Sequence, residues 1–202
     1  VHVMKTVNQL HHLNAWEQPP VAGSSLVTTT GIALLDAMLP GGGWPKNGLV
    51  EIILPDAYCD ALSLLMPALI RLSQQGRWIT MVNPTYPARA GLFTESAINH
   101  DRVLQVNPHP GRSALWTAES MLYSGDCCVV MAWPNCRTEL MGKRLQKSAA
   151  HGKALGILFS YEGLEMQPSG VATRLKLEID SEGRAVYLLN SRGEILSGEA
   201  LK

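Results

Sequence analysis

The chain has 202 residues, with 17 Lys+Arg and 17 Asp+Glu, so its formal net charge is zero. Hydrophobic residues make up 46% of the chain, which supplies a sizeable core and excludes a chain that is disordered by composition. The balanced charge argues against a protein that holds duplex DNA by neutralising phosphates. We therefore expect any DNA contact to be indirect or weak.

The sequence also gives no sign of a membrane or metal protein. No apolar run reaches the length that a spanning helix needs, and no signal-peptide pattern is present. Cys127 and Cys128 are adjacent in an apolar run, which favours buried thiols over a metal or disulfide site. His11 and His12 have no third ligand at a useful spacing. These features predict a cytoplasmic protein with no metal and no membrane contact.

The N-terminal part differs in composition from the rest. Residues 1–27 are polar and end in a stretch rich in Pro, Gly and Ser, so we expect a flexible segment and linker before one domain over 28–202. Leu10, Leu13 and Trp16 fall at helical spacing, which fits a helix that packs on its own domain as well as one that docks on a partner. Trp16 is therefore a candidate partner anchor.

Regular elements begin after this segment. The pattern predicts a short helix over Ile32–Leu39, a glycine-rich turn over 40–48, a strand over Leu49–Leu54 and a long apolar helix over Ala61–Gln75. Trp44 lies in the turn, so it is a second candidate anchor for a partner.

A junction of helix, Gly, one charged residue and buried strand then recurs. The glycine supplies a left-handed helix cap, and strands that are apolar throughout are typical of a parallel sheet covered on both faces. A helix around 93–98 leads to a further short strand over Val103–Val106. Residues 49–160 therefore predict an α/β sheet. The strands that follow the junctions are Trp78–Val82, Cys127–Ala132 and Ala154–Phe159.

The last third of the chain holds a basic helix, a hairpin and a tail. The helix is amphipathic, and its cations form either a solvated face or a contact for DNA or an acidic partner. Alternating residues over 172–179 and 185–189 predict an antiparallel hairpin at the sheet edge. We expect the polar tail after Asn190 to bind partners and to contribute little stability. The cations of the helix are Arg137, Lys143, Arg144, Lys147 and Lys153.

Phosphate chemistry is missing where an NTPase would have it. Gly41–Gly43 precedes the strand instead of following it, so it predicts a structural turn. The loop after the strand has no Gly, Lys or Thr, and its Asp56 and Asp60 would repel a triphosphate. Glu51 in the strand is interpreted as a hydrogen-bonded edge carboxylate rather than a base. The sequence predicts no enzyme activity and no cofactor.

Residues Thr28–Leu69 nevertheless resemble the opening of the RecA ATPase core. They share a Thr-Gly, a short Leu-Asp helix, a glycine-rich turn and a Leu-Val-Glu-Ile strand. The resemblance implies a RecA-like, P-loop NTPase-type fold, with a mostly parallel sheet flanked by helices and a degenerate nucleotide site. Cys59, Asp60 and Ala61 stand where that family has the terminal Gly, Lys and Thr of its phosphate loop.

The run Leu35–Pro45, which includes Gly-Gly-Gly-Trp-Pro, is similar to the ImuA family. That resemblance implies a non-catalytic accessory protein of the SOS DNA-damage response, an adaptor in a mutagenic translesion synthesis complex. The implied partners are an ImuB-type Y-family-like protein, an error-prone polymerase and RecA.

The middle of the chain also resembles the related SulA family of cell-division inhibitors, over Leu65–Trp78, Thr117–Met121 and Val129–Trp133. This second resemblance implies FtsZ as the partner. The family's aromatic is missing at Leu92, with Phe93 one place later, and the family lacks the Gly-Gly-Gly-Trp-Pro turn. Both departures favour the ImuA adaptor as the main expectation, with the FtsZ-binding inhibitor as the alternative. The residues implied on the FtsZ-facing surface are Arg77, Val82, Leu92 and Arg102.

Overall fold

The computed structural model describes residues 26–56, 59–84, 97–109, 113–134, 138–163, 169–180, 183–190 and 192–201. The N-terminal segment with its Leu10, Leu13 and Trp16 lies outside the described residues, and so do Leu92 and Phe93. Most of the helix expected around 93–98 lies outside them too.

A small two-stranded sheet opens the described part. Strand β1 (Val27–Thr28) pairs with β2 (Trp44–Pro45), and helix α1 (Ala33–Met38) lies between them in the chain. A Cβ at Gly43 would come within 2.3 Å of the Thr28 carbonyl oxygen, so this close approach requires glycine. The structural turn predicted for the glycine run is thus confirmed. The same pairing buries Trp44 completely, at 0% exposure.

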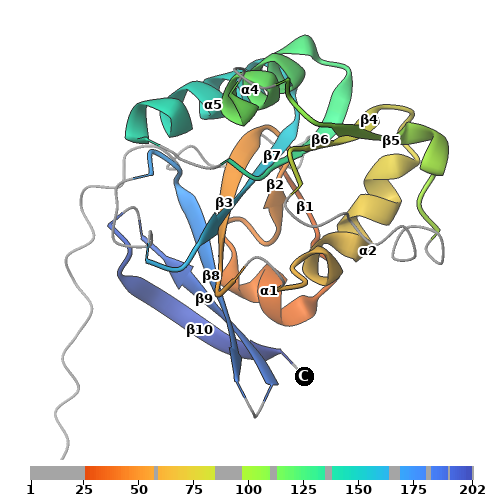
Figure 1. The fold of residues 1–202 in the computed structure, drawn as a ribbon. Coiled ribbons are helices and arrows are strands. Elements are labelled where there is room, and N and C mark those ends of the chain that lie inside the picture. The colour runs from red at the N-terminus through yellow and green to blue at the C-terminus, as the bar shows by residue number, and fades with distance from the viewer. Residues whose placement is uncertain are drawn as a thin grey trace, which may run out of the picture.

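Within the described residues, eight strands form one sheet in the order β10-β9-β8-β3-β7-β6-β4-β5 (Figure 1). The pairs between β8 and β5 in this order are all parallel, as the apolar runs predicted. This confirms a mixed α/β fold with a mostly parallel sheet. The parallel core consists of β3 (Gly48–Leu54), β7 (Leu155–Tyr161), β6 (Cys127–Ala132), β4 (Trp78–Val82) and β5 (Val103–Val106).

Helices cover both faces of this sheet. Helix α2 (Leu62–Ser73) packs its leucines on one face, in the same cluster as Ile52, Ile79 and Met131. Helices α4 (Ala114–Ser124) and α5 (Glu139–Gly152) lie on the other face, in the same cluster as Val82 and Val130 (Figure 1). The short 3-10 helix η1 (His100–Arg102) leads directly into β5.

The recurring helix–glycine junction is confirmed at two of its three positions and shifted at the third. Gly76 and Gly125 have φ of 77° and 83°. At the end of α5 the left-handed residue is Lys153, with φ of 52°, and Gly152 is still helical. A Cβ at Gly152 would lie 1.8 Å from the Leu122 carbonyl oxygen, so this glycine is required by the close contact of α5 with α4.

The C-terminal region is larger than the predicted hairpin. Strands β8 (Thr173–Asp180) and β9 (Gly183–Leu189) are antiparallel as expected, and β8 joins the core sheet parallel to β3. The tail after Asn190, however, forms a third antiparallel strand, β10 (Ile195–Leu201), against β9. The sequence analysis did not predict this strand, which forms because the turn at Asn190, closed by Asn190 N–H to the Glu194 carbonyl, reverses the chain.

A buried ion pair fastens this three-stranded unit to the core. Arg174 on β8 donates through Nε to the Glu51 carboxylate on β3 at 2.8 Å, and both side chains are 0% exposed. Ser160 on β7 donates to the other carboxylate oxygen of Glu51. Glu51 is therefore a central buried carboxylate and not the edge residue that the sequence suggested.

Candidate functional site

The loop between β3 and α2 is where an NTPase would bind phosphate. In this chain the Asp60 carboxylate bonds to the backbone N–H groups there. Asp60 Oδ1 accepts hydrogen bonds from the backbone N–H groups of Leu62 and Ser63 at 3.1 and 3.4 Å. These N–H groups begin α2, and they are the donors that a helix N-terminus offers to an anion. Asp60 thus caps α2 and occupies the position where a phosphate oxygen would bind.

The neighbours of Asp60 add no phosphate-binding group. Burial, with a smaller contribution from Asp56, raises the pKa of the Cys59 thiol to about 11. Cys59 is therefore a neutral thiol at neutral pH and a poor nucleophile. Ala61 is buried, at 3% exposure. Over the described ranges, no group of His, Cys, Asp and Glu is placed to hold a metal ion.

Arg77 was expected on a partner-facing surface. In the structure its side chain makes hydrogen bonds within the chain. Its guanidinium donates to the carbonyl oxygens of Gly125, Gly152 and Lys153 at 3.1, 2.6 and 2.8 Å. These carbonyls belong to the ends of α4 and α5, where a cation is favoured by the helix dipole. Arg77 therefore joins the ends of α4 and α5 to the start of β4.

Arg102 lies beside the same corner. Its guanidinium carbon is 5.3 Å from the ring centroid of Trp78, the first residue of β4, in cation–π geometry. Arg102 thus stacks on the residue that directly follows Arg77 in the chain. Neither arginine has a carboxylate partner among the residues that the structure describes. We call Arg77, Trp78 and Arg102 the arginine corner.

The other residues proposed from the sequence are not part of this corner. Trp44 was expected to anchor a partner, but it is fully buried and its side chain cannot reach one. Val82 was implied on the same surface as the arginines and is also 0% exposed, since it packs beneath α4. Trp16, Leu92 and Phe93 remain sequence predictions because they lie outside the described residues.

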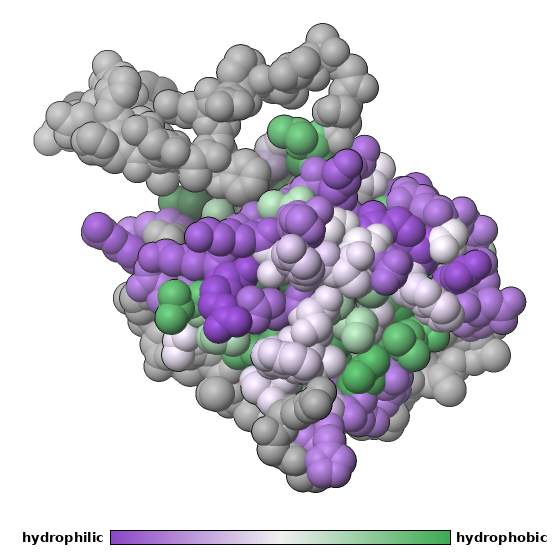
Figure 2. Space-filling model, turned by 90° about the horizontal axis from the view of Figure 1, so that it is seen from above, coloured by the Kyte–Doolittle hydropathy of each residue, from purple (hydrophilic) through white to green (hydrophobic). Residues whose placement is uncertain are grey.

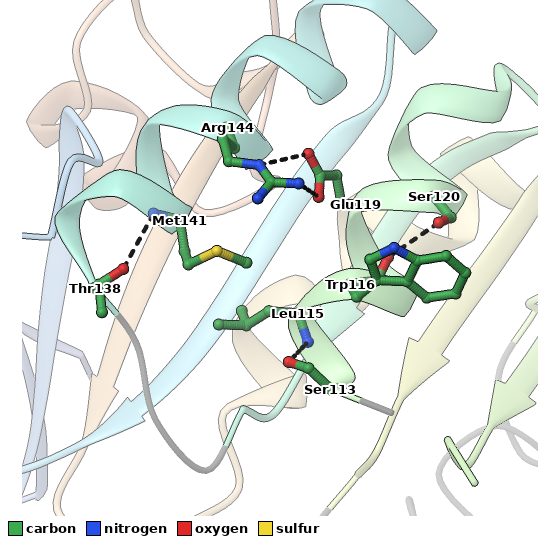
Figure 3. A network of polar contacts seen from close by, with 8 residues as sticks. All are labelled: Ser113, Leu115, Trp116, Glu119, Ser120, Thr138, Met141 and Arg144. Carbon is green, nitrogen blue, oxygen red and sulfur yellow. Dashed lines mark hydrogen bonds and ion pairs between the residues drawn. The ribbon is translucent and has the colours of Figure 1, made fainter. Parts of the chain in front are cut away.

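Trp116 on α4 is an exposed aromatic that the sequence analysis did not single out. Its side chain projects away from α5 and is 49% exposed (Figure 3). The buried residues of α4 include Leu115, Ala118 and Leu122. Trp116 lies about 100° around the helix from Leu115, and this phase would have placed it outside the core. Seen from above, weakly polar and hydrophobic residues form a band between strongly hydrophilic regions on this side (Figure 2).

An ion pair joins the two neighbouring helices α4 and α5. Arg144 on α5 donates to both carboxylate oxygens of Glu119 on α4, at 3.0 and 2.6 Å (Figure 3). Ser113 caps α4 and Thr138 caps α5 through their hydroxyl groups. The ion pair joins α4 to α5, and it shows that Arg144 already has a carboxylate partner.

The family model described as "Cell division inhibitor SulA" matches residues 49–156 of this chain. The chain belongs to the SulA family. Arg77, Trp78 and Arg102 all lie inside the matched range, whereas β8, β9 and β10 lie beyond it.

The chain is also similar to individual proteins. The cell division inhibitor SulA of Edwardsiella piscicida is 28% identical over 115 residues, which is 56% of this chain and 68% of that protein. The one from Yersinia pseudotuberculosis is 27% identical over 154 residues, or 76% of this chain and 88% of that protein. The crystal structure of SulA from Pseudomonas aeruginosa has 22% identity and a TM-score of 0.46, covering 55% of this chain and 97% of that one.

These findings correct the main expectation from the sequence. The ImuA assignment, the adaptor role in translesion synthesis and the partners that it implied are not supported, and the SulA resemblance is the one that holds. A RecA-like P-loop fold is likewise not shown. The part of that expectation that holds is a mostly parallel sheet flanked by helices. No helix in the described part of the chain is long and apolar enough to cross a membrane.

Proposed function

We propose that this chain is a non-enzymatic inhibitor of cell division that acts by binding FtsZ in the cytoplasm. Membership of the SulA family supports the inhibitor role, and relatives carry the name cell division inhibitor SulA. The carboxylate cap at Asp60 supports a role without nucleotide chemistry, since it fills the anion position of α2.

The observation that carries the proposal is the arginine corner. Arg102 is held over Trp78 without a carboxylate partner in the described region, so its charge is available to a partner. An arginine fixed by stacking loses little side-chain entropy on binding, and Trp and Arg are common binding hot spots. We therefore assign FtsZ binding to the corner, with Arg102 as its main contact.

The test is assembly of purified FtsZ with GTP, followed by sedimentation, in the presence of increasing amounts of the full chain. We expect assembly to fall as the chain approaches a stoichiometric ratio, because a binding inhibitor acts mole for mole. Arg102→Ala should weaken inhibition at least tenfold. Lys147→Ala, which removes an exposed cation from α5, is the matched control and should leave inhibition unchanged.

Two results would overturn the proposal. If the intact chain binds FtsZ at no concentration tested, the partner assignment fails. If Arg102→Ala and Lys147→Ala inhibit as well as the unmodified chain, FtsZ binds elsewhere and the corner is not the site.

A further inference from the structure

Strand β5 lies at the end of the sheet, and no described strand pairs with its outer side (Figure 1). Among the strands that the structure describes, its one pairing partner is β4, in parallel register from Ile79↔Val103 to Val82↔Val106. The Val106 carbonyl accepts from Asn83 N–H at 2.9 Å, so the backbone groups of Val106 point toward β4. Because these groups alternate along a strand, the N–H and C=O of Gln105 point outward, away from β4.

The side chains along this edge are suited to a partner strand. Leu104 has the register position of Thr80 and therefore shares the sheet face that α4 covers nearer the centre. It is 39% exposed. Arg102, two residues earlier, lies over Trp78 at the start of the same edge. Arg102 ends the 3-10 helix η1 that leads into β5, so a cation and an exposed apolar side chain lie within two residues of each other at this edge.

We propose that an extended segment of the cell-division partner adds to the outer edge of β5 as a further strand. Its backbone pairs with Gln105, an acidic side chain meets Arg102, and a large apolar side chain two residues away covers Leu104. This proposal rests on the proposed function for the identity of the partner and specifies how that partner is recognised.

The chemistry of the edge selects this occupant. Arg102 lies over Trp78, which packs against the cluster that contains α4, so its cation is on the sheet face to which Leu104 belongs. The charge of Arg102 has no carboxylate beside it in the described part of the chain, so an acidic residue complements it. β5 has only four residues, so few main-chain bonds are available and side chains must supply the selectivity.

The test uses Gln105→Pro in the full chain, with FtsZ immobilised and binding measured by biolayer interferometry. Proline removes the outward N–H of residue 105 but none of the bonds that join β5 to β4, and edge strands tolerate it at such a position. We expect affinity to fall at least tenfold. Gln105→Ala keeps the backbone donor and should stay within threefold of the unmodified chain. The melting temperature of each variant establishes that it is folded.

Hydrogen exchange on the unmodified chain gives an answer that does not depend on any variant. The Gln105 amide should exchange rapidly in the free chain and become protected when FtsZ is added, whereas the Leu104 amide, which faces β4, should be protected in both states. If the chain binds FtsZ but the Gln105 amide stays exposed, strand addition is wrong and the proposed function stands.

The remaining outcomes separate the two proposals. If no FtsZ binding occurs at all, both fail. If the Gln105 amide becomes protected on raising the concentration of the chain alone, the edge pairs with a second copy, and that result overturns the assignment of this edge to FtsZ.

Discussion

Asp60 decides the chemistry of the loop that follows β3. Its carboxylate accepts from the first N–H groups of α2, so the helix is capped from within the chain. Asp60→Ala should lower the free energy of unfolding by about 1 kcal/mol, the usual cost of losing such a cap, whereas Asp60→Asn should cost only a few tenths. Urea denaturation measures both. Equal losses in the two variants would show that the charge, and not the cap, provides the stabilisation.

Glu51 and Arg174 form the residue pair with the largest expected effect on stability. Arg174→Met removes the cation that pairs with the buried Glu51 carboxylate, which should cost about 3–5 kcal/mol in the free energy of unfolding. The double variant Glu51→Gln/Arg174→Met removes both charges and keeps an oxygen for Ser160, so it should recover most of that loss. Guanidinium unfolding at pH 7 tests this. A double variant no more stable than Arg174→Met would rule out an unpaired charge as the cause.

At the scale of elements, Arg77 holds the ends of α4 and α5 at the start of β4. Arg77→Ala removes its bonds to the carbonyls of Gly125, Gly152 and Lys153, and it should lower the free energy of unfolding by about 1–2 kcal/mol. Lys147→Ala on the outside of α5 should change it by less than about 0.5 kcal/mol. Urea unfolding compares the two. If Arg77→Ala is as stable as the unmodified chain, Arg77 acts only as a partner contact.

The core strands could be predicted because each is largely apolar and begins after a turn or the end of a helix. What could not be predicted depends on pairing between distant residues. Trp44 is in a turn by sequence, yet the pairing of β1 with β2 buries it. Glu51 and Arg174 are 123 positions apart, and their contact requires the parallel pairing of β3 with β8. The tail after Asn190 has few buried side chains, so its pattern did not reveal a strand.

The candidate site was predicted in part. Arg77 and Arg102 were identified by resemblance; the structure stacks Arg102 on Trp78, the residue after Arg77, and bonds Arg77 to the end of α4. Trp116 and Leu104 were not singled out, because their exposure follows from the phase of α4 and from the end position of β5. The family was misjudged because the ImuA and SulA resemblances share the middle of the chain, and the glycine-rich turn was given too much weight.

At the scale of the whole molecule, deleting the C-terminal end should lower stability more than deleting the N-terminal end. Deleting residues 191–202 removes β10 from β9 and from its contact with α1, so we expect a loss of about 2 kcal/mol and a melting temperature about 4–8 °C lower. Deleting residues 1–25, which the sequence predicts to be a linker segment, should shift it by less than about 2 °C. Differential scanning calorimetry compares the two, and equal shifts would contradict this division.

The ion pair between β3 and β8 also has a consequence for recombination. Glu51 lies inside the segment that matches the SulA family model, whereas Arg174 lies beyond it, so the matched segment carries a buried charge whose counter-ion is encoded elsewhere. A chimera that joins residues 1–156 of this chain to the C-terminal part of another family member should fold only if the donor brings a cation to the position of Arg174. Among natural homologues, the two positions should therefore be inherited as a unit and change together.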